Sequence, residues 1–211
     1  MSALRDRVYV VDDDPIVRRS VARVLRFAGF EALTFGSADE LLAAVDPEAE
    51  GCALLDVAMP GIDGLALQEA LVGRGIALPI LFLTGHGDVP ASVRAMKAGA
   101  VDFLTKPVED EILLAAVRQA VERGRVERDA RRDAASARAR FDALTARERE
   151  VLECVIGGML NKQVARELGI TEATVKVHRG RVMEKTGISS LAELVRVADL
   201  AGLRPPPRPE G

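Results

Sequence analysis

Short apolar runs in the first half of the chain end, one after another, at polar side chains. In chain order these polar residues are Asp12 with Asp13, Asp56, Thr84 and Lys106. In an open parallel sheet the carboxyl ends of the strands share one crevice, and ligands bind there. We therefore expect these five side chains to converge, although they are far apart in sequence. Three carboxylates, a hydroxyl and an ammonium make a poor apolar core, but they suit a Mg²⁺ ion and a phosphoryl group.

The same half of the chain alternates between apolar runs and helical patterns. The predicted strands span residues 7–12, 31–35, 52–56, 78–84 and 101–104. The predicted helices span residues 15–29, a segment from 37, residues 64–72, about 88–98 and a segment from about 109. Five strands interleaved with five helices predict an α/β doubly wound five-stranded parallel sheet with helices on both faces.

Length and charge predict a second domain. A chain of 211 residues with 48% hydrophobic residues has room for two packed domains. Residues 1–124 carry 12 Lys and Arg against 19 Asp and Glu, whereas residues 125–211 carry 17 against 13. An acidic half joined to a basic half favours two partners, with nucleic acid a candidate for the basic half.

Other functional classes find little support in the composition. The chain has no run of the roughly 18 apolar residues that a membrane helix needs, and its first residues lack an apolar signal stretch. We therefore expect a soluble, cytoplasmic protein with no membrane partner. Cys52 and Cys154 lie far apart, which predicts neither a disulfide framework nor a metal-binding spacing.

Beyond about residue 124 the large aliphatic side chains give way to Ala, Arg, Asp and Glu. This composition fits either a solvated helix or a flexible connector, so we predict a linker at 124–140 and leave its rigidity open. Short helices follow, with a capping box at Thr145 and Glu148 and an expected N-cap at Asn161. Two of these helices are separated by a tight glycine-containing turn, which is typical of a helix-turn-helix. The Pro-rich end, residues 205–211, is expected to be disordered.

Several spaced motifs resemble the receiver domain of two-component response regulators. They are VDDD (11–14), LLDVAMPGIDG (54–64), a threonine followed by GHGD, AMKAGAVDF (95–103) and TKP (105–107). The resemblance covers roughly residues 5–123, and we set a receiver domain at 1–123. It implies a flavodoxin-like fold and a phosphoryl group accepted on Asp56 from a sensor histidine kinase.

The metal follows from the chemistry of that reaction. A carboxylate that attacks phosphorus at neutral pH must approach a group that is already anionic. Mg²⁺ offsets this repulsion, and it binds through a few carboxylates while it keeps several waters. We expect Asp12, Asp13 and Asp56 to hold the ion. The resemblance adds the backbone carbonyl of Ala58 as a further ligand.

Three further residues are expected to act on the phosphoryl group or respond to it. Lys106 should neutralise the phosphoryl oxygens, and Thr84 should hydrogen-bond one of them. By resemblance, Phe103 is the switch aromatic that turns inward when Thr84 moves toward the phosphoryl group; a plain core phenylalanine is the alternative. His86 lies in the GHGD loop without a partner motif, so we interpret it as a loop residue rather than a phosphoryl acceptor.

The segment LTAREREVLECVIGGMLNKQVARELGITEATVKVHRGRVMEKTGISSLAELVRVA resembles the LuxR-type helix-turn-helix domain. We set this small all-α DNA-binding domain at 141–204. Together the two halves resemble a response regulator of the FixJ/NarL type. The resemblance implies a phosphorylation-controlled transcription regulator that forms a homodimer when phosphorylated, binds double-stranded promoter DNA and works with RNA polymerase.

A helical wheel of residues 172–186 predicts which side chains face DNA. Lys176 and Val177 lie near the centre of the outward face, whereas His178 points inward. The exposed face of a recognition helix enters the major groove, so we expect Lys176 to contact guanine and Val177 to contact a thymine methyl group. The other DNA-binding candidates are Lys162, Thr174, Arg179 and Arg181. We expect the three basic residues among them to contact phosphates.

Two other functions fit parts of the sequence. A Mg²⁺-dependent hydrolase with an aspartate nucleophile usually carries a second acid two residues later, where this chain has Ala58. We therefore expect no enzymatic turnover of an external substrate. A DNA-binding protein with a receiver that no longer needs phosphorylation is the second alternative, and the complete set of Asp13, Asp56, Thr84 and Lys106 argues against it.

Overall fold

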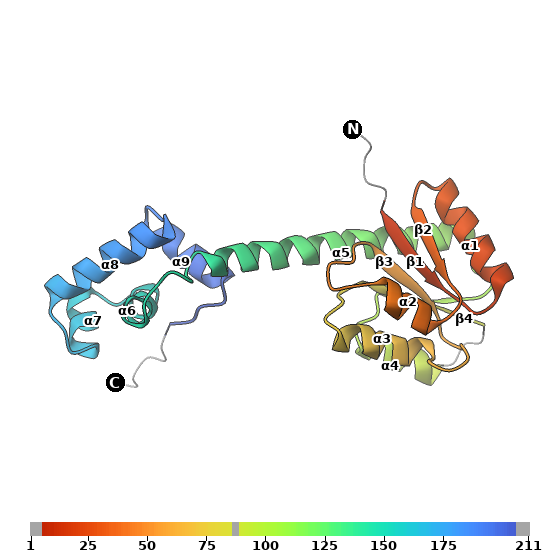
Figure 1. Cartoon of the computed structure of the whole chain (residues 1–211), viewed down its shortest axis with the longest axis horizontal. Coiled ribbons are helices and arrows are strands. Elements are labelled where there is room, and N and C mark those ends of the chain that lie inside the picture. The colour runs from red at the N-terminus through yellow and green to blue at the C-terminus, as the bar shows by residue number, and fades with distance from the viewer. Residues whose placement is uncertain (1–5, 86–88, 206–211) are drawn as a thin grey trace. The chain divides into compact units, whose positions relative to one another are not determined.

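The computed structural model describes residues 6–85 and 89–205 (Figure 1). Its contacts divide the chain into two compact units, Met1–Glu127 and Arg128–Gly211. The first unit contains the sheet, and the second is helical.

The sheet of the first unit has five parallel strands in the order β2-β1-β3-β4-β5. This confirms the predicted doubly wound parallel sheet. The strands are β1 Arg7–Val11, β2 Glu31–Phe35, β3 Cys52–Asp56, β4 Ile80–Thr84 and β5 Asp102–Thr105. Strands β3 and β4 are buried along their whole length, because helices cover both faces of the sheet.

Helices lie on both faces of the sheet (Figure 1), and an apolar layer holds them against each face. The helices are α1 Pro15–Phe27, α2 Ala38–Ala44, α3 Gly64–Gly73, α4 Val89–Lys97 and α5 Asp110–Ala139. On one face, Leu25 of α1 and Val117 of α5 pack against strand residues such as Leu54. On the other, Leu41 of α2 and Leu67 of α3 join a cluster that also contains strand residues and α4. Alternate strand residues thus fill opposite layers, as the period of two requires.

The second unit contains α6 Ala146–Ile156, α7 Asn161–Glu167, α8 Glu172–Thr186 and α9 Leu191–Leu200, packed around one apolar cluster. The capping box at Thr145 and Glu148 is present in full. Asn161, expected as an N-cap, is instead the first helical residue of α7, and Leu160 holds the cap position. The backbone N–H of Leu160 donates to Gln163 Oε1 at 2.7 Å, so this amide has a hydrogen-bond partner although the cap residue is apolar.

The segment predicted as a linker is helical in the structure, because α5 runs through it to Ala139. Its first residues contact the first unit: Arg125 pairs with Asp6 at 2.8 Å. Its last residues belong to the second unit, where Ala137 is buried in the core and Arg138 Nε donates to the carbonyl of Ala201 at 3.0 Å. Among the residues described, neither α5 nor any other helix is long and apolar enough to cross a membrane.

Candidate functional site

The residues predicted at strand ends meet at one edge of the sheet. Asp12 follows β1, Asp56 ends β3, Thr84 ends β4 and Lys106 follows β5. These four strands are neighbours in the sheet, and their register pairs Asp56 with Leu83 and Thr84 with Thr105. The parallel arrangement therefore brings together side chains that are up to 94 residues apart in sequence.

Three carboxylates form the centre of this site. Oxygens of Asp12, Asp13 and Asp56 lie within 4.8 Å of one another. Asp12 is fully buried, Asp56 is nearly so, and Asp13 is exposed. Packing like charges together is unfavourable unless a cation compensates them. Carboxylate oxygens, one of them open to solvent, are the donor set that Mg²⁺ prefers, so these residues fit the ion that the sequence predicted.

Lys106 supplies one compensating charge. Its Nζ lies 2.7 Å from Asp12 Oδ2 and 2.9 Å from Asp56 Oδ2. Burial favours a lower pKa for Lys106, but its hydrogen bonds and charge interactions with both carboxylates outweigh burial and raise the pKa. Burial also raises the pKa of Asp12, and the ammonium offsets only part of this effect. Three carboxylates against one ammonium leave this group of side chains with an excess of negative charge.

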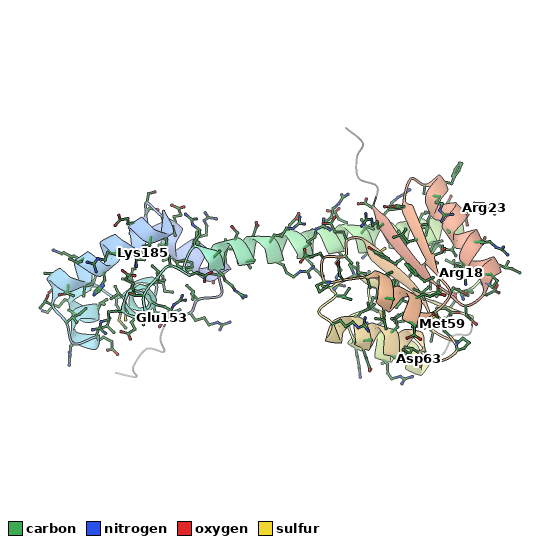
Figure 2. All side chains as sticks on the ribbon, in the orientation of Figure 1. Arg18, Arg23, Met59, Asp63, Glu153 and Lys185 are labelled. Carbon is green, nitrogen blue, oxygen red and sulfur yellow. The ribbon has the colours of Figure 1, made fainter. Side chains whose placement is uncertain are left out.

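The loop between β1 and α1 fixes the metal-site carboxylates. Asp12 Oδ1 accepts from the Asp14 amide at 2.9 Å, and Asp14 in turn caps α1 by accepting from the Ile16 amide at 2.7 Å. Asp14 is therefore the N-cap of α1. Arg18, which sequence reasoning missed, donates from Nη1 to the carbonyl oxygen of Asp12. Figure 2 shows it on the helix that follows the loop.

The loop after β3 holds Asp56 from the other side. The Ala58 amide donates to Asp56 Oδ1 at 3.4 Å, and Ala58 is exposed beside it. Gly64 begins α3 so close to β3 that a Cβ atom there would overlap the Asp56 carbonyl oxygen. Asp63 caps that helix by accepting from the Ala66 amide at 2.7 Å. A glycine at this position therefore lets α3 start against the backbone that carries Asp56.

Thr84 and Phe103 lie on neighbouring strands. Thr84 is buried, and its carbonyl oxygen accepts from the Lys106 amide at 2.7 Å. Phe103 is half-buried, and its ring centroid lies 5.9 Å from that of Phe82. The predicted role of Phe103 as a switch stays a prediction. His86, interpreted as a loop residue, lies outside the described residues.

In the second unit, α8 presents the predicted face to solvent. Lys176, Val177 and Arg181 are exposed, and Val177 is 52% exposed although it is a large apolar residue. Thr174 is half-buried, and its amide donates to the capping hydroxyl of Thr171 at 3.1 Å. An exposed valine flanked by basic side chains suits a thymine methyl group better than water.

Two of the remaining candidates differ in their surroundings. Lys162 is exposed on the first turn of α7. Arg179 is half-buried, and its Nη1 donates to Asn161 Oδ1 at 2.7 Å, so its guanidinium is directed toward α7. His178 is half-buried, and its Nδ1 has no hydrogen-bond partner among the residues described. Its inward orientation agrees with the helical wheel.

An ion pair that sequence reasoning missed joins α8 to α6. Lys185 Nζ lies 2.6 Å from Glu148 Oε2, and Glu148 is buried. The hydrogen bond from Lys185, followed by that from the Thr145 amide, lowers the pKa of Glu148 to about 2. Figure 2 shows Lys185 near the end of α8. The spacing of 37 residues gave no local signal for this pair.

Comparisons with known proteins agree with both units. Residues 8–118 match the family described as response regulator receiver domain. Residues 142–198 match the family of bacterial regulatory proteins, luxR family. Both matches fall inside the ranges where the sequence motifs were found.

Similar proteins cover nearly the whole chain. Nodulation protein W of Bradyrhizobium diazoefficiens is 48% identical over 93% of this chain and 86% of its own length. Transcriptional regulatory protein FixJ of Azorhizobium caulinodans is 46% identical over 94% of each chain. Among solved structures, response regulator StyR is 47% identical with a TM-score of 0.79, covering 92% of this chain and 98% of its own. The chain therefore belongs to the two-component response regulators of the FixJ/NarL type, which are phosphorylation-controlled, DNA-binding transcription regulators.

Proposed function

We propose that Asp56 accepts the phosphoryl group from a sensor histidine kinase. A carboxylate oxygen of Asp56 forms a bond to phosphorus, the bond from phosphorus to the imidazole nitrogen of the donor breaks, and that nitrogen keeps the electron pair. The observation that carries this proposal is the position of Asp56, 2.9 Å from the Lys106 ammonium and within 4.8 Å of Asp12 and Asp13.

Each neighbouring group has a distinct part in this proposal. Asp12, Asp13, Asp56 and the Ala58 carbonyl would hold Mg²⁺, which would offset the charge repulsion between the nucleophile and the phosphoryl oxygens. Lys106 is near enough to Asp56 to neutralise a phosphoryl oxygen bound there. Thr84, on the adjacent strand end, donates its hydroxyl to another of these oxygens.

Phosphorylation is proposed to act on dimerisation through Thr84 and Phe103. Both residues lie on strands that flank α4, and Phe103 contacts the apolar layer that α4 also joins. A movement of Thr84 toward the phosphoryl group would let Phe103 turn inward and shift α4 and β5. The exposed Val93 and Met96 on α4 support this face as the surface of a phosphorylated homodimer, because large apolar side chains favour burial between subunits.

The second unit is proposed to contact DNA through α8. Lys176 and Val177 would contact bases in the major groove, and Lys162 and Arg181 would contact phosphates. Thr174 and Arg179 belong to the same DNA-binding set, although the Arg179 guanidinium is hydrogen-bonded to Asn161. A homodimer would bind two half-sites of a promoter and act on RNA polymerase there. A cytoplasmic location is part of this proposal.

Replacing Asp56 with asparagine tests the phosphoryl acceptor. The wild-type protein is incubated with a small phosphodonor and Mg²⁺, and intact mass is measured before and after acid treatment. We expect one acid-labile phosphoryl adduct in the wild type and none in Asp56→Asn, with unchanged far-UV circular dichroism. Equal labelling of the variant would refute the assignment. Continuous consumption of the donor without an adduct would instead favour the hydrolase alternative.

A further inference from the structure

Arg179 of α8 is half-buried. It borders a small apolar cavity of about 70 Å³, which is also lined by Val151 and Val155 of α6 and by Leu191 and Leu194 of α9. Its Nη1 donates to Asn161 Oδ1 of α7 at 2.7 Å. The side chain thus borders apolar surface while its guanidinium reaches α7, as long basic side chains commonly do.

The acceptor of this hydrogen bond is placed where it can affect DNA binding. Asn161 is the first residue of α7, and its side chain does not cap that helix. The next residue is Lys162, the proposed phosphate contact, and both residues line one open groove together with Arg179. Any force that holds Asn161 against α8 therefore also fixes where the Lys162 side chain begins.

We propose that Arg179 is a positioning residue that acts on DNA through Asn161. Its charge-assisted hydrogen bond holds the first turn of α7 against α8, so that Lys162 meets a phosphate while α8 lies in the major groove. This inference rests on the proposed DNA contact of Lys162. It replaces the simpler expectation that Arg179 contacts a phosphate independently of α7, because its guanidinium is already directed toward α7 by the bond from Nη1 to Asn161.

The two roles differ in how salt affects binding. Each phosphate contact that is lost reduces the slope of log affinity against log salt by about 0.9. Asn161→Ala removes no charge, so it can reduce this slope only if it displaces a basic side chain. We expect Asn161→Ala to reduce the slope by about 0.9, as Lys162→Met does. If Arg179 contacts a phosphate directly and needs no support from Asn161, Asn161→Ala leaves the slope unchanged.

The experiment uses the full chain and measures affinity for a target promoter and for random DNA across a salt series. Arg179→Met removes the guanidinium and keeps much of the stem that borders the cavity. In the Lys162→Met background, we expect neither Asn161→Ala nor Arg179→Met to reduce the slope further, because the contact they support is already absent. A further reduction of about 0.9 by Arg179→Met in this background would overturn the inference in favour of a direct contact.

Matched variants separate failure of this inference from failure of the DNA interface. Arg181→Met removes an exposed arginine from the same helix and should reduce the slope by about 0.9 through its own contact. If Lys162→Met and Arg181→Met both left the slope unchanged, the proposed interface and this inference would fall together. If both reduced it and Asn161→Ala did not, only this inference would be overturned. Thermal unfolding checks that each variant is folded. If Asn161→Ala does not fold, the Arg179→Met variants with and without Lys162→Met decide between a positioning role and a direct phosphate contact.

Discussion

Lys106→Met should lower the free energy of unfolding of the receiver domain in the absence of Mg²⁺. The same change should raise the affinity of the domain for Mg²⁺. The ammonium lies 2.7 Å from Asp12 and 2.9 Å from Asp56, and the Lys106 side chain is only 20% exposed. Removing one partner of a buried ion pair costs about 3–5 kcal/mol in free energy of unfolding. Because this site opens to solvent at Asp13, we expect the lower end, about 3 kcal/mol.

Mg²⁺ should reverse much of this loss, because ion and ammonium compete for the same carboxylates. An ammonium and a divalent ion about 4 Å apart repel each other by about 8 kcal/mol at an effective dielectric constant near 20. A lysine side chain can swing away when the ion enters, and the site opens to solvent at Asp13, so we expect about a quarter of this value. Removing the ammonium should then tighten Mg²⁺ binding by about 1.4–2.8 kcal/mol, or roughly tenfold to a hundredfold.

Denaturant unfolding of the receiver, with and without Mg²⁺, measures both effects. At an ion concentration about 100 times the dissociation constant, bound Mg²⁺ adds about 2.7 kcal/mol to the free energy of unfolding. Lys106→Met should reach this value at a lower Mg²⁺ concentration than the wild type. Lys97→Met, at the exposed end of α4, is the matched control and should change neither quantity. Equal Mg²⁺ affinities in wild type and Lys106→Met would refute the competition.

Lys176→Ala should lower the ratio of target to random DNA binding by about 1–3 kcal/mol, measured by titration; an unchanged ratio would require a different base-contacting face. Charge reversal at Lys97 should weaken phosphorylation-dependent dimerisation in sizing experiments more than Arg23→Glu on α1, where Figure 2 shows an exposed arginine; the opposite ranking would exclude the α4–β5 face. Glu148→Gln should destabilise the second unit at neutral pH: the pKa of Glu148 falls from 4.5 to about 2 on folding, so the stabilisation is complete above pH 4.5 and disappears as pH falls toward 2. A stability difference that stays constant across that range would show that ionisation is not the cause.

The receiver site was predictable because topology alone decides it. Strand ends of a parallel sheet meet at one edge, so the positions of Asp12, Asp56, Thr84 and Lys106 after apolar runs were enough to bring them together. The boundaries of β2 and β3 also agree with the predicted ones, since short apolar runs there are bounded by turn residues.

Two side-chain pairs between helices were not predicted, because they depend on how the helices pack against each other. The pairs Arg179–Asn161 and Lys185–Glu148 join residues 18 and 37 positions apart, and no periodicity links them. On a helical wheel Arg179 lies at the edge of the DNA face, and only the position of α7 turns it inward. Asn161 was expected as a cap because its residue type favours that position, but its side chain bonds Arg179 instead.

The long helix α5 determines which boundaries are suitable for expressing each domain as a separate fragment. A fragment that ended at residue 123 would lose the pairing of Arg125 with Asp6, and a fragment that began at 141 would lose the buried Ala137 and the bond from Arg138 to Ala201. It would also lose Arg140, whose Nε donates to the Thr186 carbonyl at 3.0 Å at the end of α8. The residues between the two sequence motifs therefore pack against both folded units. An isolated DNA-binding fragment needs the last residues of this segment, because they contact the core and the end of α8.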